Sequence, residues 1–140
     1  MKYLHTMLRI SNIDESLKFF CDGLDLKEKR RMEFTDDRFT LIFLAAPDDS
    51  EAEIELTYNW DGDNLEDTSR NFGHLAYKVK NIYNTCKKLM DMGVTINYPP
   101  KDGHMAFVKS PDNISIELLQ DGDALSPQEP WTSMKNIGTW

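Results

Sequence analysis

The chain has 140 residues, of which 40% are hydrophobic, and its 16 basic and 24 acidic side chains give a net charge of −8. This length allows one domain, or two half-domains that share a core. The charge excludes nucleic acid and anionic membrane surfaces as partners, because both bind through basic patches. No apolar run approaches the roughly 18 residues of a membrane span, and Arg9 comes too early for a secretory signal, so we expect a cytoplasmic protein.

The first half of the chain predicts a strand, a helix and three further strands. Residues 4–10 form the first strand. Asn12 is placed to cap a helix that carries Asp14 and Glu15 in its first turn, and Gly23 is placed to end it. Strands follow near residues 26–34, 38–45 and 53–59, and turn-forming residues at 47–50 separate the last two.

The second half repeats this order. A strand is predicted at 75–79, a helix at 82–92 that stops at Gly93, and strands near 94–97, 105–109 and 114–119. Residues 5–13 resemble residues 74–82, and both copies end on Ile-Glu-Leu, at 54–56 and 116–118. This indicates a duplicated module. We expect a single domain, 1–140, made of modules at about 2–60 and 71–120.

The segment 121–140 follows the second module and has no helical or strand period. Its two prolines predict an extended tail over the surface. We expect Trp131 and Trp140 to pack onto the body or a partner subunit, with lining of a substrate pocket as the alternative.

Strand parity divides the side chains of each module between two faces. His5 falls on the polar face of the first strand, and Glu55 on the polar face of the last strand of that module. His74 and Glu117 take the same places in the second module. Each sheet is therefore expected to cover its helix with an apolar face and to present a polar face on the other side.

A single strand histidine is usually a surface or hydrogen-bonded residue, and a glutamate between two apolar residues usually faces solvent. The duplication changes this reading, because two His/Glu pairs occupy equivalent places. A pseudo-twofold relationship would bring His5, Glu55, His74 and Glu117 together. Two imidazoles and two carboxylates suit a divalent transition metal that keeps positions for water.

The chain resembles the vicinal oxygen chelate superfamily, and within it the glyoxalase I (lactoylglutathione lyase) family, over residues 2–120. The resemblance rests on His5-Thr-Met-Leu-Arg9, Ile54-Glu-Leu-Thr-Tyr-Asn-Trp60, Phe72-Gly-His74 and the turn 110–113 that leads into 116–118. It implies an α+β fold of two βαβββ modules. It also implies a homodimer, in which each site is shared between the first module of one subunit and the second module of the other.

The resemblance places His5, Glu55, His74 and Glu117 at the positions that hold one divalent metal per site. The short chain is similar to the branch that favours Ni(II) or Co(II), with Zn(II) possible. Glu117 is the first choice for the catalytic base, and Glu55 is its counterpart in the other module.

The candidate substrate contacts are Arg9, Asn59, Arg70, Lys101, His104 and Met105. The first three match residues that grip the γ-glutamyl end of glutathione. The loop 98–105 is several residues shorter than is usual in the family. Its nearest equivalent to the family lysine that holds the glycyl carboxylate is His104, with Lys101 close by. A glycine usual in the family is replaced by Asn113, which we expect to preserve the turn because asparagine tolerates positive φ.

The implied reaction converts the methylglyoxal–glutathione hemithioacetal into S-lactoylglutathione by proton transfer through an enediolate. A metal that polarises two adjacent oxygens stabilises that species, and a neighbouring carboxylate can act as base. One alternative is an epimerase or isomerase of the same superfamily that acts on another substrate. Another is a metal-free protein of the same fold that binds a small molecule, although a pure binder has no need of the paired carboxylates.

Overall fold

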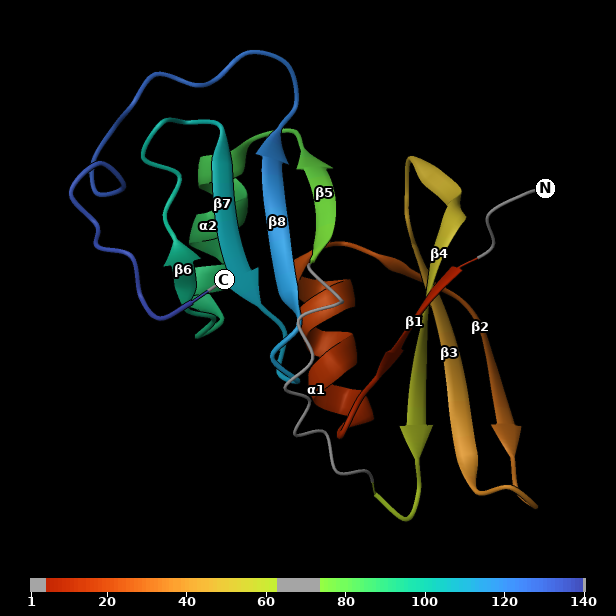
Figure 1. Cartoon of the computed structure of the whole chain (residues 1–140). Coiled ribbons are helices and arrows are strands. Elements are labelled where there is room, and N and C mark those ends of the chain that lie inside the picture. The colour runs from red at the N-terminus through yellow and green to blue at the C-terminus, as the bar shows by residue number, and fades with distance from the viewer. Residues whose placement is uncertain (1–4, 63–73, 140) are drawn as a thin grey trace. The chain divides into compact units, whose positions relative to one another are not determined.

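The computed structural model describes residues 5–62 and 74–139 (Figure 1). The chain divides into two compact units, Met1–Thr68 and Ser69–Trp140. Each unit holds a four-stranded sheet with a helical segment between its first and second strands. The predicted α+β fold with a βαβββ order in each half is thereby confirmed. Among the described residues, no helix combines the length and apolarity needed to cross a membrane.

The first unit runs through β1 (His5–Arg9), α1 (Ile13–Leu17), η1 (Lys18–Gly23), β2 (Lys27–Phe34), β3 (Phe39–Ala46) and β4 (Asp49–Asn59). Its sheet has the order β1-β4-β3-β2, with β1 parallel to β4 and the other neighbours antiparallel. Strand β4 begins earlier than the predicted residue 53, because pairing with β3 resumes after a register shift, where Ala46 meets Asp49.

The helical segment of this unit begins as predicted. The Asn12 side chain accepts a hydrogen bond from the Glu15 amide at 3.0 Å and so satisfies one donor of the first turn. The expectation of a uniform α-helix was wrong for residues 18–23, which wind as a wider π-helix. The adjacent Phe19 and Phe20 are both buried in this turn. A left-handed residue, Asp25 with φ 63°, turns the chain toward β2.

The second unit runs through β5 (Leu75–Val79), α2 (Ile82–Asp91), β6 (Ile96–Tyr98), β7 (Met105–Lys109) and β8 (Ser115–Gln120). Its sheet has the order β5-β8-β7-β6, and α2 packs on β6, β7 and β8. The helix buries Ile82, Cys86 and Leu89, the apolar positions expected from its spacing. It stops before Gly93, whose φ of +86° is favourable for glycine.

The predicted division of each sheet into two faces is also confirmed. Apolar positions of β1, β4 and β8 and the residue after β1 are less than 9% exposed, namely Leu8, Ile10, Ile54, Leu56, Ile116 and Leu118. Burial of each such side chain contributes roughly 1.5–3 kcal/mol to folding. These residues form the cores, and the alternating positions present the candidate site residues on the opposite faces. The apolar positions of the outer strand β5, Leu75, Tyr77 and Val79, are half-buried and alternate with exposed residues.

The turn at 110–114 forms with Asn113 at φ 65°, as expected for the asparagine that replaces the family glycine. The Ser110 hydroxyl accepts a hydrogen bond from the Ile114 amide at 3.1 Å, and the Ser110 amide donates to the Ile114 carbonyl at 2.9 Å. This turn delivers the chain into β8 in the register that positions Glu117.

The described part of the tail, residues 121–139, is irregular and packs on its own unit. Trp131 is 4% exposed, so its predicted packing onto the body is confirmed, whereas Trp140 lies outside the described residues. The Ile137 amide donates to the Asn97 carbonyl at 2.9 Å, and the Asn97 side-chain amide donates to the Ile137 carbonyl at 3.0 Å. The tail therefore runs along β6, one of the two outer strands of this sheet.

Candidate functional site

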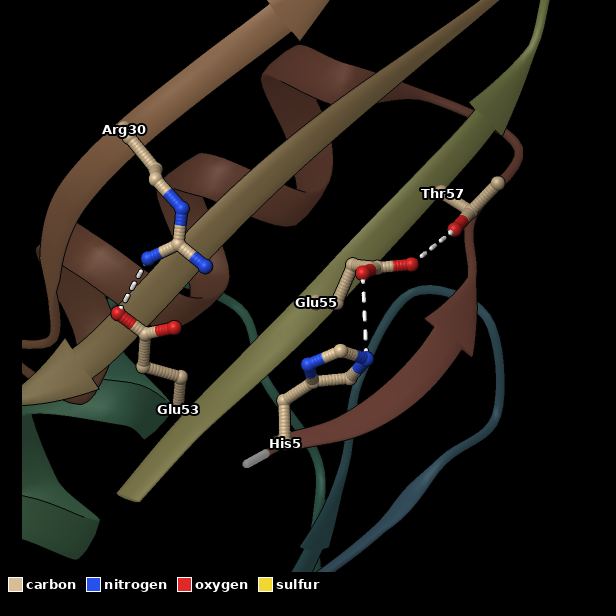
Figure 2. Close-up of polar contacts among 5 residues, drawn as sticks. All are labelled: His5, Arg30, Glu53, Glu55 and Thr57. Carbon is tan, nitrogen blue, oxygen red and sulfur yellow. Dashed lines mark hydrogen bonds and ion pairs between the residues drawn. The ribbon is translucent and has the colours of Figure 1, made fainter. Parts of the chain in front are cut away.

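The first candidate pair joins the beginning of β1 to the centre of β4. The parallel register pairs Met7 with Glu55, so His5, two residues earlier on the same face, reaches the carboxylate diagonally. His5 Nε2 lies 3.3 Å from Glu55 Oε2 (Figure 2). The Thr57 hydroxyl donates to Glu55 Oε1 at 3.3 Å. The Glu55 side chain is 14% exposed, so it is held from two sides at the surface of the sheet.

The second candidate pair repeats this arrangement. His74 directly precedes β5, and Ala76 is the register partner of Glu117 in β8. His74 Nε2 lies 3.2 Å from Glu117 Oε2. The offset between histidine and glutamate is thus the same in both units. The structure brings together the members of each pair that the duplicated sequence singled out.

A phenylalanine completes each pair, and the sequence analysis did not identify it. Phe43 is the antiparallel partner of Glu55, and Phe107 is the antiparallel partner of Glu117. The His5 ring meets the Phe43 ring edge-on with centroids 5.7 Å apart, and the His74 and Phe107 centroids lie 5.4 Å apart. Edge-on packing of this kind restricts the ring of the histidine. The pairing of neighbouring strands, which parity within one strand does not reveal, would have located both rings.

The next strand of each sheet backs this phenylalanine. In the first unit the Arg30 guanidinium carbon lies 3.6 Å from the centroid of Phe43. In the second unit Tyr98, the register partner of Phe107, meets that ring edge-on at 6.5 Å. The two half-sites therefore share one framework, and the group that backs the phenylalanine is a cation in the first and a phenol in the second.

The donor atoms fit a divalent metal. Two ligands that each lie about 2.1 Å from one cation, at a right angle, are about 3 Å apart. The Nε2–Oε2 separations of 3.3 and 3.2 Å approach this value in both pairs. Within residues 5–62 and 74–139, no cluster of three or more histidine, cysteine or acidic side chains could hold a metal, so each unit by itself offers a pair.

The candidate contacts to a γ-glutamyl group end neighbouring strands. Arg9 is the last residue of β1, and Asn59 is the last residue of β4. Because these strands are parallel neighbours, both residues lie at the same end of the sheet, where the two strands finish. Arg9 is exposed, and Asn59 is half-buried. Arg70 lies outside the described residues.

The short loop between β6 and β7 carries the other candidates. Its backbone is held by Asp102, whose carboxylate accepts hydrogen bonds from the amides of His104 and Met105 at 2.9 and 3.2 Å. Met105 opens β7 and shares the face of Phe107, two residues further on. The His104 side chain is exposed and Lys101 is half-buried. Met105 is thus the loop residue that shares the face of the second His/Glu pair.

Two βαβββ units, each presenting a histidine and a glutamate on an open sheet face, define the vicinal oxygen chelate class of fold. The chain matches the family model described as the Glyoxalase/Bleomycin resistance protein/Dioxygenase superfamily over residues 2–118. It belongs to that superfamily.

Curated relatives that match most of the chain are named as lactoylglutathione lyases. The chain is 42% identical to a probable lactoylglutathione lyase of Synechocystis, over 86% of this chain and 95% of the relative. It is 40% identical to the lactoylglutathione lyase of Haemophilus influenzae, over 86% and 93% respectively. Among solved structures it resembles the trypanothione-dependent glyoxalase I of Leishmania major, with a TM-score of 0.78, 35% identity and 86% of both chains covered.

Proposed function

We propose that the protein isomerises the methylglyoxal–glutathione hemithioacetal to S-lactoylglutathione in a metal-dependent reaction. The observation that carries this proposal is the pair of equivalent His/Glu contacts, at 3.3 and 3.2 Å, in a chain whose relatives at 36–42% identity are lactoylglutathione lyases. We assign the activity to the cytoplasm, as expected from the sequence.

The metal is held by His5, Glu55, His74 and Glu117, one divalent ion per site, with Ni(II) or Co(II) favoured over Zn(II). When bound, it supplies Lewis-acid polarisation of two adjacent oxygens of the substrate. Each unit contributes two ligands, and two ligands alone leave a cation open to water. We therefore assign each complete site to the first unit of one subunit and the second unit of its partner, in a homodimer.

Glu117 acts as the base that removes the proton from the carbon bearing sulfur and oxygen and returns it to the neighbouring carbon. An asymmetry between the halves supports this choice. The Thr57 hydroxyl donates a hydrogen bond to one carboxylate oxygen of Glu55. The residue at the equivalent position beside Glu117 is Leu119, whose side chain has no donor. Glu117 is thus less constrained in taking a proton. Base catalysis of this kind contributes about 10²–10⁴-fold.

The glutathionyl group is held at both ends. Arg9, Asn59 and Arg70 contact its γ-glutamyl end, and the loop residues Lys101, His104 and Met105 contact its glycyl end. The net charge of −8 opposes an anionic tripeptide. Local cations, Arg9 above all, therefore provide the attraction.

A thiol with a blocked glycyl carboxylate is the second candidate. The relative from Leishmania major is trypanothione-dependent. Trypanothione is a glutathione conjugate in which the glycyl carboxyls are bound as amides. In this chain the place of the family lysine is taken by His104, with the carboxylate of Asp102 two residues away. The charge of Asp102 offsets that of Lys101, so this loop attracts an anionic glycyl end less than a lone lysine would and also suits a neutral one.

The test is metal content of the purified protein, followed by thioester formation from methylglyoxal with glutathione or trypanothione. We expect one divalent ion for each two His/Glu pairs and turnover with at least one thiol, and the ratio of kcat/KM values identifies the thiol. A protein that binds metal without turning over either substrate would support the epimerase or isomerase alternative. A protein that binds no metal and is inactive would support the small-molecule binding alternative.

A further inference from the structure

Arg30 lies on the face of the first sheet that carries His5 and Glu55. Figure 2 shows its side chain reaching over the sheet toward Glu53, on the side from which His5 and Glu55 also project. Neither the duplicated motif nor the family resemblance gives Arg30 a role. Its contacts, however, connect it to the first half-site in two ways.

The first connection passes through Phe43. The guanidinium lies 3.6 Å from the centroid of this ring, close enough for a cation–π contact. The same phenyl ring also packs edge-on with the His5 imidazole. The guanidinium comes from β2, the phenyl ring from β3 and the imidazole from β1, and β4 lies between the last two strands. Removal of the guanidinium would free one face of Phe43 and so loosen the surface against which His5 is placed.

The second connection passes through Glu53. Arg30 Nη1 lies 2.5 Å from Glu53 Oε1, and Glu53 is the β-register partner of His5. The Glu53 side chain is only 15% exposed. The hydrogen bond from Arg30 to this carboxylate joins β2 to β4 across the face of β3. Arg30 is thereby held in one position while it covers Phe43.

The second unit repeats the device with different chemistry. Tyr98 backs Phe107, which in turn meets His74. Both copies thus have a phenylalanine that contacts the histidine on one side and a second group on the other, although that second group differs. Repetition at equivalent register positions marks the arrangement as part of the half-site.

We propose that Arg30, anchored by Glu53 and stacked on Phe43, is a positioning residue that holds His5 for metal binding. This inference rests on the proposed metal-binding role of His5. Lysine cannot replace Arg30 fully, because an ammonium lacks the plane that covers the ring while bonding to the carboxylate. Tyr98 has the corresponding role for His74.

The test measures metal affinity by chelator competition with Ni(II), Co(II) and Zn(II). Arg30→Ala should weaken the Kd by about two- to fivefold, the size expected for loss of an exposed cation–π contact, and Arg30→Lys should recover part of it. Arg31→Ala is the matched control. Arg31 is the next residue of β2, lies on the other face by parity, and makes its own ion pair with Glu28 at 2.8 Å. Its removal should leave the Kd unchanged.

A double-mutant cycle separates positioning from general loss of structure. In a His5→Ala background, Arg30→Ala should cause no further loss of metal affinity, because its effect acts through the imidazole. Independent, additive losses would overturn the proposal. So would equal effects of Arg30→Ala and Arg31→Ala.

A readout on the metal-free protein keeps this inference distinct from the proposed function. The imidazole NMR signals of His5, assigned with His5→Ala, should shift and broaden in Arg30→Ala and stay in place in Arg31→Ala. If the wild-type protein binds no metal, the proposed function fails, and the positioning role for metal binding fails with it. If the wild-type protein binds metal but the His5 signals are unmoved in Arg30→Ala, the positioning role alone fails.

Discussion

The indole of Trp131 stacks on the phenol ring of Tyr83, with centroids 6.1 Å apart and ring planes 13° from parallel. The Tyr83 hydroxyl also donates to the Ser126 carbonyl at 3.1 Å. These contacts fix the tail to α2. We expect Trp131→Ala to destabilise the protein by about 3–5 kcal/mol, the usual cost of truncating a buried tryptophan, as measured by urea unfolding. Trp131→Phe, which keeps an aromatic ring, should lose less. Equal losses in the two variants would argue against the stack.

A second prediction concerns the contact between the tail and the loop before β7. Gly103 has φ +72°, and a methyl group on it would lie 2.0 Å from the Leu125 carbonyl oxygen. Gly122 has a similar φ, +79°, with nothing within 4 Å of the same position. Gly122→Ala should therefore cost only the backbone strain of about 1–2 kcal/mol. Gly103→Ala should cost about 1–3 kcal/mol more, because the tail must move. Thermal unfolding of both variants checks this, and equal shifts in Tm would contradict it.

The proposed metal ligands give a third prediction. Alanine in place of any one of His5, Glu55, His74 or Glu117 should lower metal affinity or kcat/KM by at least about tenfold, because each removes one of four donors. Metal content and steady-state kinetics provide the two measurements. Glu33→Ala, on β2 outside both pairs, is the control. Full metal binding with full activity in two of the four variants would exclude the four-ligand site.

The fourth prediction distinguishes a shared site from a site within one chain. His5→Ala and His74→Ala each disable one His/Glu pair. In a mixed dimer, a shared arrangement leaves one site with all four ligands, so mixing the two inactive proteins under exchange conditions should restore activity. The control is each variant mixed with itself. Mixed dimers that form, by mass spectrometry, yet stay inactive would place each site within one chain.

The fifth prediction concerns the thiol. Arg9→Ala should raise KM for the glutathione hemithioacetal about 10–100-fold, because a hydrogen-bonded charge contact contributes about 1.5–3 kcal/mol. His104→Ala should change KM by less than about fivefold, because an exposed side chain contributes little. His104→Lys should favour glutathione over trypanothione if the glycyl carboxylate is recognised there. An unchanged KM in Arg9→Ala would indicate another substrate.

The sequence predicted the order of elements and the faces of the strands, because both depend on local spacing. Alternation alone placed Leu8 and Leu56 in the core, and the repeat alone paired His5 with Glu55. The wide turn at Phe19–Phe20 was not predicted, since apolar spacing does not report the width of a helix turn. Phe43 was missed for another reason: its position opposite Glu55 depends on inter-strand register, which only the folded sheet reveals.

The same limit applies to Arg30. In the sequence it is one charge among several in β2, and charge runs usually mark a solvated surface. Only the register with Phe43 and the contact with Glu53 distinguish it from its neighbour Arg31. The role of Arg70 and the assembly of the two pairs into one site stay predictions.

The tail that runs along β6 also affects how copies of the chain meet one another. An outer strand offers main-chain N–H and C=O groups to any other extended chain, and unprotected edges of this kind lead to aggregation. The Asn97 carbonyl of β6 already accepts a hydrogen bond from the Ile137 amide, so the tail segment around Ile137 covers part of that edge. In the other sheet, the outer strand β2 carries consecutive charges at residues 27–31, which protect its edge in a different way. Removal of the tail would leave β6 with neither form of protection.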